Sequence, residues 1–453
     1  MLQKNKTNLE EVFKAYDIRG LYKTQIDENF AKKLALSLTY YFGLKQLKIA
    51  TAYDVRDSSK ELYKVLNEEF VREGHEVHAL GLVPTPLFYN YIAGYGMNGG
   101  VMVTASHNPP DWTGFKLCKE KAEIIGEGSG MEMIKSNFFQ DIKPIKVGEG
   151  KLLEVNAENY YINFLSSHVN SSLNYSVCID IGNGSTFSIM PKICNSYKMK
   201  CELLFPEPDG RFPNRPSEPT DETLTKLKEI VKRSSCPGAA FDGDGDRLVM
   251  VDEEGNVVRG DVLFALIAKG YENYDEKRAI IEVNFSEAVE YFLRNMGYKV
   301  YISRVGHSFI TKEMIDKSAL IGGEISGHYY FKETYGADDS IFAFVKVLET
   351  LKKLKISIKD FIKELNLPPS SDIVAVPVVD SAKDYIMEKL KVYYEKESKK
   401  VIEIDGIKAY FDDGWILIRK SNTMPQIKVK AEGYGYKRLL EQAIKLIDEL
   451  SKS

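Results

Sequence analysis

The chain lacks any long uncharged apolar run, so no segment approaches the ~20 residues that a membrane-spanning helix requires. Its first residues, MLQKNKTNLEEVF, also lack the apolar stretch of a signal peptide. The chain also lacks a large excess of charge, since it has 61 Lys and Arg, 65 Asp and Glu, and a formal net charge of −4. The basic residues are spread along the sequence and form no cluster of the kind that binds nucleic acid. We therefore expect a cytoplasmic protein with no membrane or nucleic-acid partner.

Cysteine is scarce as well. The five cysteines are odd in number and none has CxxC spacing, which argues against a zinc site. We expect reduced thiols, as in most cytosolic proteins, and no disulfide framework. The cysteines are Cys118, Cys178, Cys194, Cys201 and Cys236.

What the sequence does contain is a repeated pattern of strands and helices. With 453 residues, the chain is too long for one hydrophobic core. Three copies of a strand–helix–strand unit begin at LKIATAY (47–53), SVCIDI (176–181) and AIIEV (279–283), and each later supplies a short apolar strand that ends in a polar loop. Such alternation predicts mostly parallel α/β sheets, in which ligands bind beyond the carboxyl ends of the strands.

The pattern changes after the Pro/Ser-rich break LNLPPSSD (365–372), where short strands between two helices are typical of an antiparallel sheet. The predicted fold is three similar α/β domains with mixed, mostly parallel sheets plus a smaller C-terminal α+β domain, arranged around a central cleft. We place the domains at residues 1–150, 151–252, 253–366 and 367–453.

The first polar loop, VTASHNPP (103–110), places Ser106 directly after a strand. A serine there becomes a nucleophile if a neighbouring group takes its proton or a metal steadies the charge, but alone it could equally be bonded to the backbone. His107 could orient the serine loop or only cap it. The two prolines predict a rigid turn.

The second loop, FDGDGDR (241–247), carries carboxylates at alternate positions, Asp242, Asp244 and Asp246. In an extended loop these point towards one place, which is costly without a cation. Oxygen-only ligands with room for phosphate favour Mg²⁺, and Arg247 suits a phosphate oxygen. A calcium-binding EF-hand is rejected, because Arg247 stands where that loop needs glycine and a strand follows.

Two further loops offer polar groups after strands. In GGEISGH (322–328), Glu324 and Ser326 could hold adjacent sugar hydroxyls, while His328 could bind there or pack structurally. RKSNT (419–423) combines a guanidinium, hydroxyls and backbone amides, which makes either a phosphate cradle or a polar hairpin. Its candidate phosphate contacts are Arg419, Ser421, Asn422 and Thr423.

Taken together, TASHNPP, DGDGDR, GEISGH and RKSNT, in this order and spacing, resemble the α-D-phosphohexomutase superfamily. FKAYDIRG (13–20) and VGHSFI (305–310) match as well, so the resemblance covers essentially the whole chain. GEISGH and RKSNTMP are most similar to the phosphomannomutase/phosphoglucomutase group. The resemblance implies a four-domain, heart-shaped enzyme with a deep central cleft.

The resemblance also implies a mechanism. Ser106 would carry the phosphoryl group as phosphoserine, and Asp242, Asp244 and Asp246 would bind Mg²⁺ together with an oxygen of Ser106. Phosphoserine would transfer its group to a hexose monophosphate, giving a bound 1,6-bisphosphate that turns over and returns its other phosphate. Glucose or mannose 1,6-bisphosphate is the expected activator, and the enzyme is expected to be a monomer or weak dimer.

Other residues follow from the same resemblance. Glu324 and Ser326 would hold hydroxyls 3 and 4 of the sugar, while RKSNT would take the phosphate that does not react. Arg19, Lys116 and Arg247 could supply positive field, although Arg19 could equally pair with a carboxylate. His307 and Lys116 are the candidates for the general base, and Tyr16 is expected near the substrate.

One residue departs from the family's pattern. Similar dual-specificity members often carry lysine in the loop after the third domain's first strand, where this chain has Asn284. A cationic phosphate contact is therefore missing there, which leaves the preference between mannose and glucose phosphates open.

The function that we expect is interconversion of hexose 1-phosphate and hexose 6-phosphate, with mannose or glucose as the sugar. The first alternative is a phosphoglucosamine mutase. A second is a phosphohydrolase, because FDGD after a strand fits enzymes with an aspartyl nucleophile and would make Asp242 that nucleophile. A third is a sugar-phosphate binder without turnover, against which the intact serine and metal loops argue.

Overall fold

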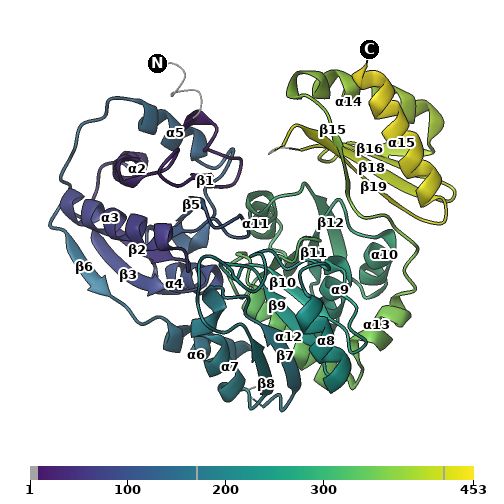
Figure 1. The fold of residues 1–453 in the computed structure, drawn as a ribbon, viewed down its shortest axis with the longest axis horizontal. Helices are drawn as coiled ribbons and strands as arrows, with labels where there is room; N and C mark the ends of the chain where they lie inside the picture. Colours follow the sequence, from purple (N-terminus) through teal and green to yellow (C-terminus); the bar gives the residue numbers. More distant parts are fainter. Residues whose placement is uncertain (1–8, 170–171, 422–423, 453) are drawn as a thin grey trace.

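The computed structural model describes residues 9–169, 172–421 and 424–452. In these residues the chain forms four sheets, arranged as successive units along the sequence (Figure 1). The purple first unit and the yellow last unit lie on opposite sides of the view, and the middle units lie between them. Three mixed, mostly parallel sheets precede an antiparallel one, which confirms the predicted fold class.

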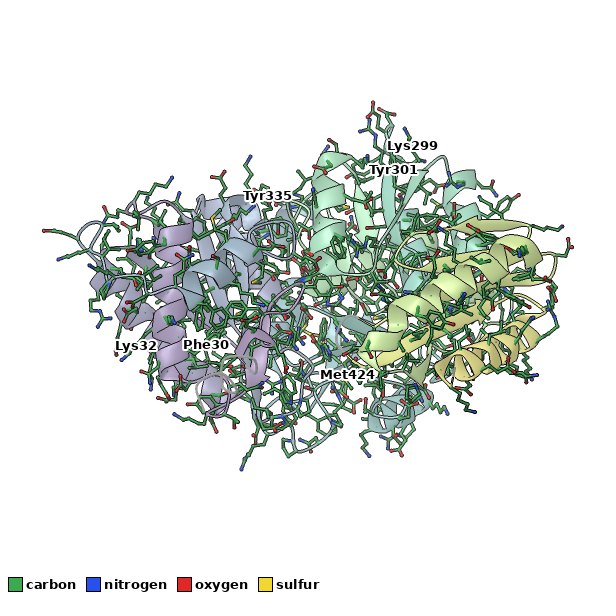
Figure 2. The ribbon with its side chains drawn as sticks, turned by 90° about the horizontal axis from the view of Figure 1, so that it is seen from above. Phe30, Lys32, Lys299, Tyr301, Tyr335 and Met424 are labelled. Atoms are coloured by element: carbon green, nitrogen blue, oxygen red, sulfur yellow. A yellow bond between two sulfur atoms is a disulfide. The ribbon has the colours of Figure 1, made fainter. Side chains whose placement is uncertain are left out.

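The first unit is a six-stranded sheet with its helices: β1 (Ile18–Leu21), α2 (Glu28–Tyr41), β2 (Lys48–Tyr53), α3 (Asp57–Glu73), β3 (Glu76–Leu82), α4 (Thr85–Tyr95), β4 (Gly99–Val103), β5 (Trp112–Lys119), α5 (Met131–Phe139) and β6 (Lys151–Glu154). The strand order is β1-β5-β4-β2-β3-β6, and only β5 runs antiparallel to both of its neighbours, β1 and β4. The side chain of Asp27 accepts a hydrogen bond from the backbone N of Phe30, which caps α2. Phe30 then faces the core while Lys32 is exposed (Figure 2).

The second unit repeats part of this topology and contains α6 (Glu158–His168), β7 (Ser176–Asp180), α7 (Met190–Ser196), β8 (Lys200–Leu204), α8 (Thr225–Ser234), β9 (Gly238–Phe241) and β10 (Leu248–Val251). The third contains α9 (Gly260–Gly270), β11 (Arg278–Glu282), α10 (Glu287–Asn295), β12 (Lys299–Ser303), α11 (His307–Asp316), β13 (Ile321–Gly323), β14 (Tyr329–Phe331), α12 (Ser340–Leu354) and α13 (Ile358–Leu365). Their strand orders are β10-β9-β7-β8 and β12-β11-β13-β14. The predicted repeat is confirmed, because β4, β9 and β13 each lie between a parallel and an antiparallel neighbour.

The last unit is an antiparallel sheet of β15 (Val374–Pro377), β16 (Lys400–Ile402), β17 (Ile407–Phe411), β18 (Gly414–Lys420) and β19 (Gln426–Glu432), with α14 (Asp380–Glu397) and α15 (Tyr436–Ser451). The two helices pack on one face of this sheet and form a core of their own. A much larger core is continuous from α4 through the second and third units. On the opposite face of the last sheet, Trp415 and Leu417 pack against Val283 of the third unit.

The expectation for the cysteines is wrong for one pair. Cys194 at the end of α7 and Cys201 in β8 form a disulfide, with their Cα atoms 6.3 Å apart. The chain reverses between them with Lys198 at a positive φ of 53°, so residues seven positions apart lie side by side. CxxC spacing therefore could not indicate the pair. Cys118, Cys178 and Cys236 are free thiols, as expected.

No helix in the described part of the chain is long and apolar enough to cross a membrane.

Candidate active site

The loop after β4 holds Ser106 in an unusual backbone conformation. Its φ is 48°, in the left-handed region that residues with a Cβ seldom adopt, and the residue is 1% exposed. The backbone N of Ser106 donates to Thr104 Oγ1 at 2.8 Å. Arg56, which is paired with Asp54 at 3.1 Å, donates to the carbonyls of Ser106 at 2.9 Å and Asn108 at 2.6 Å. These bonds hold the serine loop in one conformation.

The loop after β9 brings three buried carboxylates together. Asp242, Asp244 and Asp246 each place a carboxylate oxygen within 4.8 Å of the others. Gly245 has a positive φ of 73°, which allows the loop to turn. Ser106 Oγ donates a 2.7 Å hydrogen bond to Asp242 Oδ2, so the serine and the carboxylates form one site between the first and second units.

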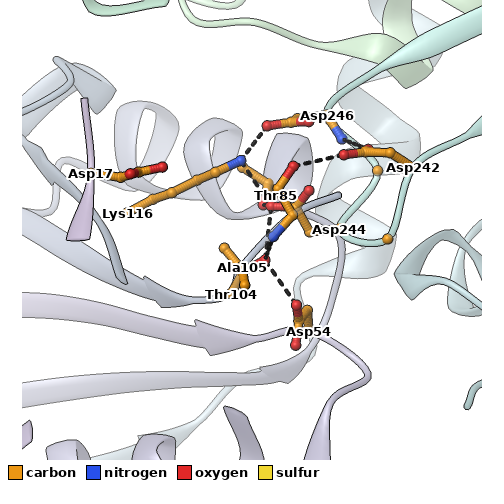
Figure 3. A network of polar contacts seen from close by, with 12 residues as sticks. Asp17, Asp54, Thr85, Thr104, Ala105, Lys116, Asp242, Asp244 and Asp246 are labelled. Carbon is orange, nitrogen blue, oxygen red and sulfur yellow. Dashed lines mark hydrogen bonds and ion pairs between the residues drawn. The ribbon is translucent and has the colours of Figure 1, made fainter. Parts of the chain in front are cut away.

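Lys116 from β5 enters the same site. Its Nζ lies 2.8 Å from Asp244 Oδ2 and also contacts Asp246 (Figure 3). Burial disfavours the charged form, but the carboxylates of Asp244 and Asp246 outweigh it and raise the pKa of Lys116. The ammonium therefore stays charged in this arrangement.

The carboxylates retain capacity for a cation even with Lys116 present. Burial, followed by the charges of Asp246 and Asp244, raises the pKa of Asp242 well above its usual range. Asp244 Oδ1 is buried and accepts no hydrogen bond from the described residues. An unpartnered oxygen among crowded carboxylates fits a bound cation, and a donor set made only of oxygen fits a hard divalent ion such as Mg²⁺.

The third loop connects to the carboxylates through His328. Its Nδ1 lies 2.9 Å from Ser326 Oγ and 3.2 Å from Glu324 Oε2, and its Nε2 lies 3.5 Å from Asp246 Oδ1. Although burial opposes it, Asp246 and Glu324 raise the pKa of His328 to about 10. The imidazolium thus links the second and third units electrostatically.

Glu324 is already bonded within the protein. Its Oε1 accepts from the backbone N of Gly306 at 2.9 Å, and its Oε2 accepts from Tyr330 at 2.7 Å. Despite burial, the hydrogen bond from His328 lowers the pKa of Glu324 to about 2. Ser326, by contrast, is exposed.

Tyr16 and His307 meet where the first and third units approach each other. Their rings make an edge contact with centroids 5.6 Å apart, and the Tyr16 hydroxyl donates to the carbonyl of Val305 at 3.0 Å. Burial, reinforced by the charge of Lys116, lowers the pKa of His307 to about 4. His307 is therefore neutral near pH 7 and able to accept a proton.

Arg19, His107 and Arg247 lie around the serine and aspartate loops. Arg19 donates to Asp17 at 2.7 Å and to Asn108 Oδ1 at 2.6 Å, so it is both paired with a carboxylate and attached to the serine loop. His107 Nδ1 lies 3.3 Å from Ser106 Oγ, and burial lowers the pKa of His107 well below its usual range.

Arg247 donates to Glu218 at 2.8 Å, while its Nε is buried and donates no hydrogen bond to the described residues.

Within the RKSNT segment, Arg419 and Lys420 are the last residues of β18, and Ser421 follows them. Arg419 and Ser421 are buried, and Arg419 Nη1 lies 3.1 Å from Asp405 Oδ2. Lys383 from α14 donates to the carbonyls of Ser421 at 3.0 Å and Met424 at 2.7 Å. The candidate residues Asn422 and Thr423 lie outside the described residues.

Several residues at the site were missed by sequence reasoning. Thr85 donates to Asp244 through its hydroxyl and its backbone N, both at 2.8 Å (Figure 3). Asp338 lies with Asp246 and His328, and burial raises the pKa of Asp338 to about 7. Arg56 stood in the polar run DVRDSS directly after a predicted strand, which was a usable signal. Lys383 and Asp338 had no such signal, because they reach the site through tertiary packing.

Comparison with known sequences agrees with this architecture over the whole chain. Residues 10–143, 159–255 and 259–367 match alpha/beta/alpha domains I, II and III of phosphoglucomutase/phosphomannomutase, and residues 373–449 match its C-terminal domain. A phosphomannomutase of Methanocaldococcus jannaschii is 35% identical over 458 residues, covering 97% of this chain and 98% of the relative. A phosphomannomutase/phosphoglucomutase of Pseudomonas syringae is 31% identical, covering 93% and 91%.

A solved structure shows the same fold. It is a phosphoglucomutase/phosphomannomutase family protein from Burkholderia thailandensis, with a TM-score of 0.88 and 25% identity, covering 97% of this chain and 98% of the other. The fold, the four loops and these matches define an enzyme of the α-D-phosphohexomutase superfamily. Within that superfamily, the chain belongs to the phosphoglucomutase/phosphomannomutase family.

Proposed function

We propose that the chain interconverts hexose 1-phosphate and hexose 6-phosphate, with mannose or glucose as the sugar, through phosphoserine at Ser106. The observation that carries this proposal is the 2.7 Å hydrogen bond from Ser106 Oγ to Asp242, within a group of three buried carboxylates. A hydroxyl on a strained, braced loop beside a cation site is suited to receive and release a phosphoryl group. Relatives named for both sugars support the substrate class.

The first half-reaction exchanges one P–O bond for another. A sugar hydroxyl attacks phosphoserine, the new O–P bond forms, and the bond from phosphorus to Ser106 Oγ breaks. Ser106 Oγ takes up one proton as it leaves, which balances the proton that the sugar hydroxyl gives up. The proton of the attacking hydroxyl passes to a base, for which we favour His307, because it is neutral near pH 7 while Lys116 is held charged. The resulting 1,6-bisphosphate turns over and returns its other phosphate to Ser106.

The carboxylates of Asp242, Asp244 and Asp246, with the Ser106 oxygen, are the residues that would hold Mg²⁺. When bound, the ion supplies positive charge to the phosphoryl oxygens. Lys116 adds a fixed charge beside Asp244 and Asp246, and Arg19 keeps the serine loop in place through Asn108.

The third and fourth units would bind the rest of the substrate. Ser326 and His328 present polar groups beside Asp246, while Glu324 mainly orders its loop. Arg419 and Ser421, with Asn422 and Thr423, are the proposed contacts of the phosphate that does not react. Tyr16 lies against His307 and would contact the same substrate.

The test is phosphorus NMR of the protein with Mg²⁺, a trace of glucose 1,6-bisphosphate, and mannose 1-phosphate or glucose 1-phosphate. Appearance of the 6-phosphate supports the mutase, and the two rates give the sugar preference. Conversion of glucosamine 1-phosphate alone would instead support a phosphoglucosamine mutase. Release of inorganic phosphate would support the hydrolase, which Asp242 disfavours because it is buried and bonded to Ser106.

A further inference from the structure

Arg419 and Lys428 lie side by side on the inner face of the last sheet. They are directly opposite each other in the β18–β19 ladder, and opposite residues of an antiparallel pair point to the same face. Ile427 and Val429, which flank Lys428, point to the helix-covered core. Lys428 therefore points away from that core, and it is only partly buried.

The two cations of this pair are neighbours although like charges repel each other. Burial, followed by the charge of Arg419, lowers the pKa of Lys428, while the carboxylates of Glu218 and Glu282 act in the opposite direction.

The donors of this pair are not used up by the protein. Nε of Arg419 is buried without a hydrogen bond to any described residue. The Lys428 ammonium has no hydrogen bond or ion pair with the described part of the chain either. Two adjacent cations with free donors indicate an anionic ligand.

We propose that Lys428 is a further phosphate-binding residue, which together with Arg419 binds the phosphate of the hexose phosphate that is not reacting at Ser106. The proposal rests on the proposed function of the same site. A phosphate dianion offers acceptors to both cations at once. Lysine acts as a point charge on a flexible stem, so it accepts a phosphate presented from either end of the sugar.

Another lysine of β19, Lys430, is already bonded to the loop that carries Asn284. The backbone carbonyl of Asn284 accepts a 2.8 Å hydrogen bond from Lys430 Nζ. Lys430 is buried and committed to that bond, whereas Lys428, two residues earlier on the same strand face, remains partly exposed. Lys428 is therefore the lysine of this strand that is available to a ligand.

The experiment compares Lys428→Gln, Lys428→Arg and the control Lys420→Gln. Lys420 has the same charge and is adjacent to Arg419, but it is exposed and paired with Asp384 at 2.6 Å. We expect Lys428→Gln to raise KM for glucose 1-phosphate and glucose 6-phosphate roughly tenfold, with kcat changed much less, because it removes one charge-assisted contact. Lys428→Arg should restore KM to within about threefold, and Lys420→Gln should leave it unchanged.

A second measurement separates this proposal from the proposed function. Binding of inorganic phosphate to each variant is titrated by phosphorus NMR without turnover. Weaker phosphate binding in Lys428→Gln, and not in Lys420→Gln, supports the proposal even if the wild-type protein converts no hexose phosphate. Equal phosphate binding and equal KM in Lys428→Gln and wild-type protein would overturn it, whether or not the wild-type protein is a mutase.

Discussion

Ser106 and Asp242 are 136 residues apart, yet Ser106 Oγ donates a 2.7 Å hydrogen bond to Asp242 Oδ2. The bond joins the loop after β4 to the loop after β9, so it depends on how the first two units dock. Thr85 reinforces that docking, because its backbone N and its hydroxyl both donate to Asp244 at 2.8 Å. The position of the Ser106 hydroxyl is therefore a property of the interface between units.

Replacing Ser106 tests the phosphoryl carrier. Ser106→Ala should lower turnover by about 10³-fold or more, because it removes the atom that accepts the phosphoryl group. Intact-mass measurement after incubation with glucose 1,6-bisphosphate should show phosphate on the wild-type chain and none on the variant. Ser136→Ala, at an exposed serine of the same unit, should behave like the wild type. Phosphate retained on Ser106→Ala would place the carrier elsewhere.

Replacing Asp244 tests the cation site. Asp244→Asn should weaken Mg²⁺ binding by roughly 10–100-fold, because one carboxylate ligand loses its charge. Mg²⁺ should also raise the Tm of the wild type more than that of the variant. Asp221→Asn, at an exposed acid of the second unit, is the control. An unchanged Mg²⁺ titration in Asp244→Asn would remove this residue from the ligand set.

Replacing Lys383 tests whether Ser421 and Met424, which lie between β18 and β19, must be held in place. Lys383→Met keeps much of the apolar stem but removes the donor to the carbonyls of Ser421 and Met424. We expect KM for hexose phosphates to rise several-fold, with less effect on kcat, since these two carbonyls flank the proposed phosphate contacts and lie outside the proposed reacting centre. Steady-state kinetics of Lys389→Met, an exposed position on the same helix, provides the control.

If Lys383→Met kept the wild-type KM, the hydrogen bonds from Lys383 to Ser421 and Met424 would contribute to stability alone. A lower Tm would then be the only effect of the substitution.

Glu73 gives a pH dependence of folding that is separate from catalysis. Burial raises the pKa of Glu73 from 4.5 to about 7, so the folded chain keeps this proton between those values while the unfolded chain has lost it. The stabilisation is complete below about pH 4.5 and is lost as pH rises towards 7, and it is worth about 3 kcal/mol. Urea unfolding of the wild type and Glu73→Gln at pH 5 and pH 8 measures it.

We compare the free energy of unfolding of Glu73→Gln with that of the wild type at each pH. This difference should favour the variant more at pH 8 than at pH 5. The Thr39 hydroxyl donates to Glu73 and also lies 2.7 Å from Nε2 of His75, whose titration has the opposite effect on stability. Burial lowers the pKa of His75 to about 4, so its contribution grows as pH rises from about 4 to 6.5. His75 is present in both proteins, so the difference between them isolates Glu73. If the difference in the free energy of unfolding between the two proteins were the same at pH 5 and pH 8, the raised pKa of Glu73 would be contradicted.

The repeated fold was predictable because local sequence carries it. The strands LKIATAY, SVCIDI and AIIEV are apolar runs followed by helices, and the structure contains all three at these positions. The convergence of Asp242, Asp244 and Asp246 could also be predicted, since five consecutive residues in a turn cannot place them far apart. The disulfide between Cys194 and Cys201 could not, because it depends on how closely α7 and β8 pack.

The sequence by itself determined the strand and helix pattern, the polar loops at the ends of the strands and the residue types that those loops carry. Those features depend on neighbours along the chain, through side-chain periodicity and turn residues. Only the tertiary structure decided that Lys116 stays charged between Asp244 and Asp246, and that His328 links Asp246 to Glu324. Charge state and free donors depend on burial and on partners from other units, and no local pattern records either.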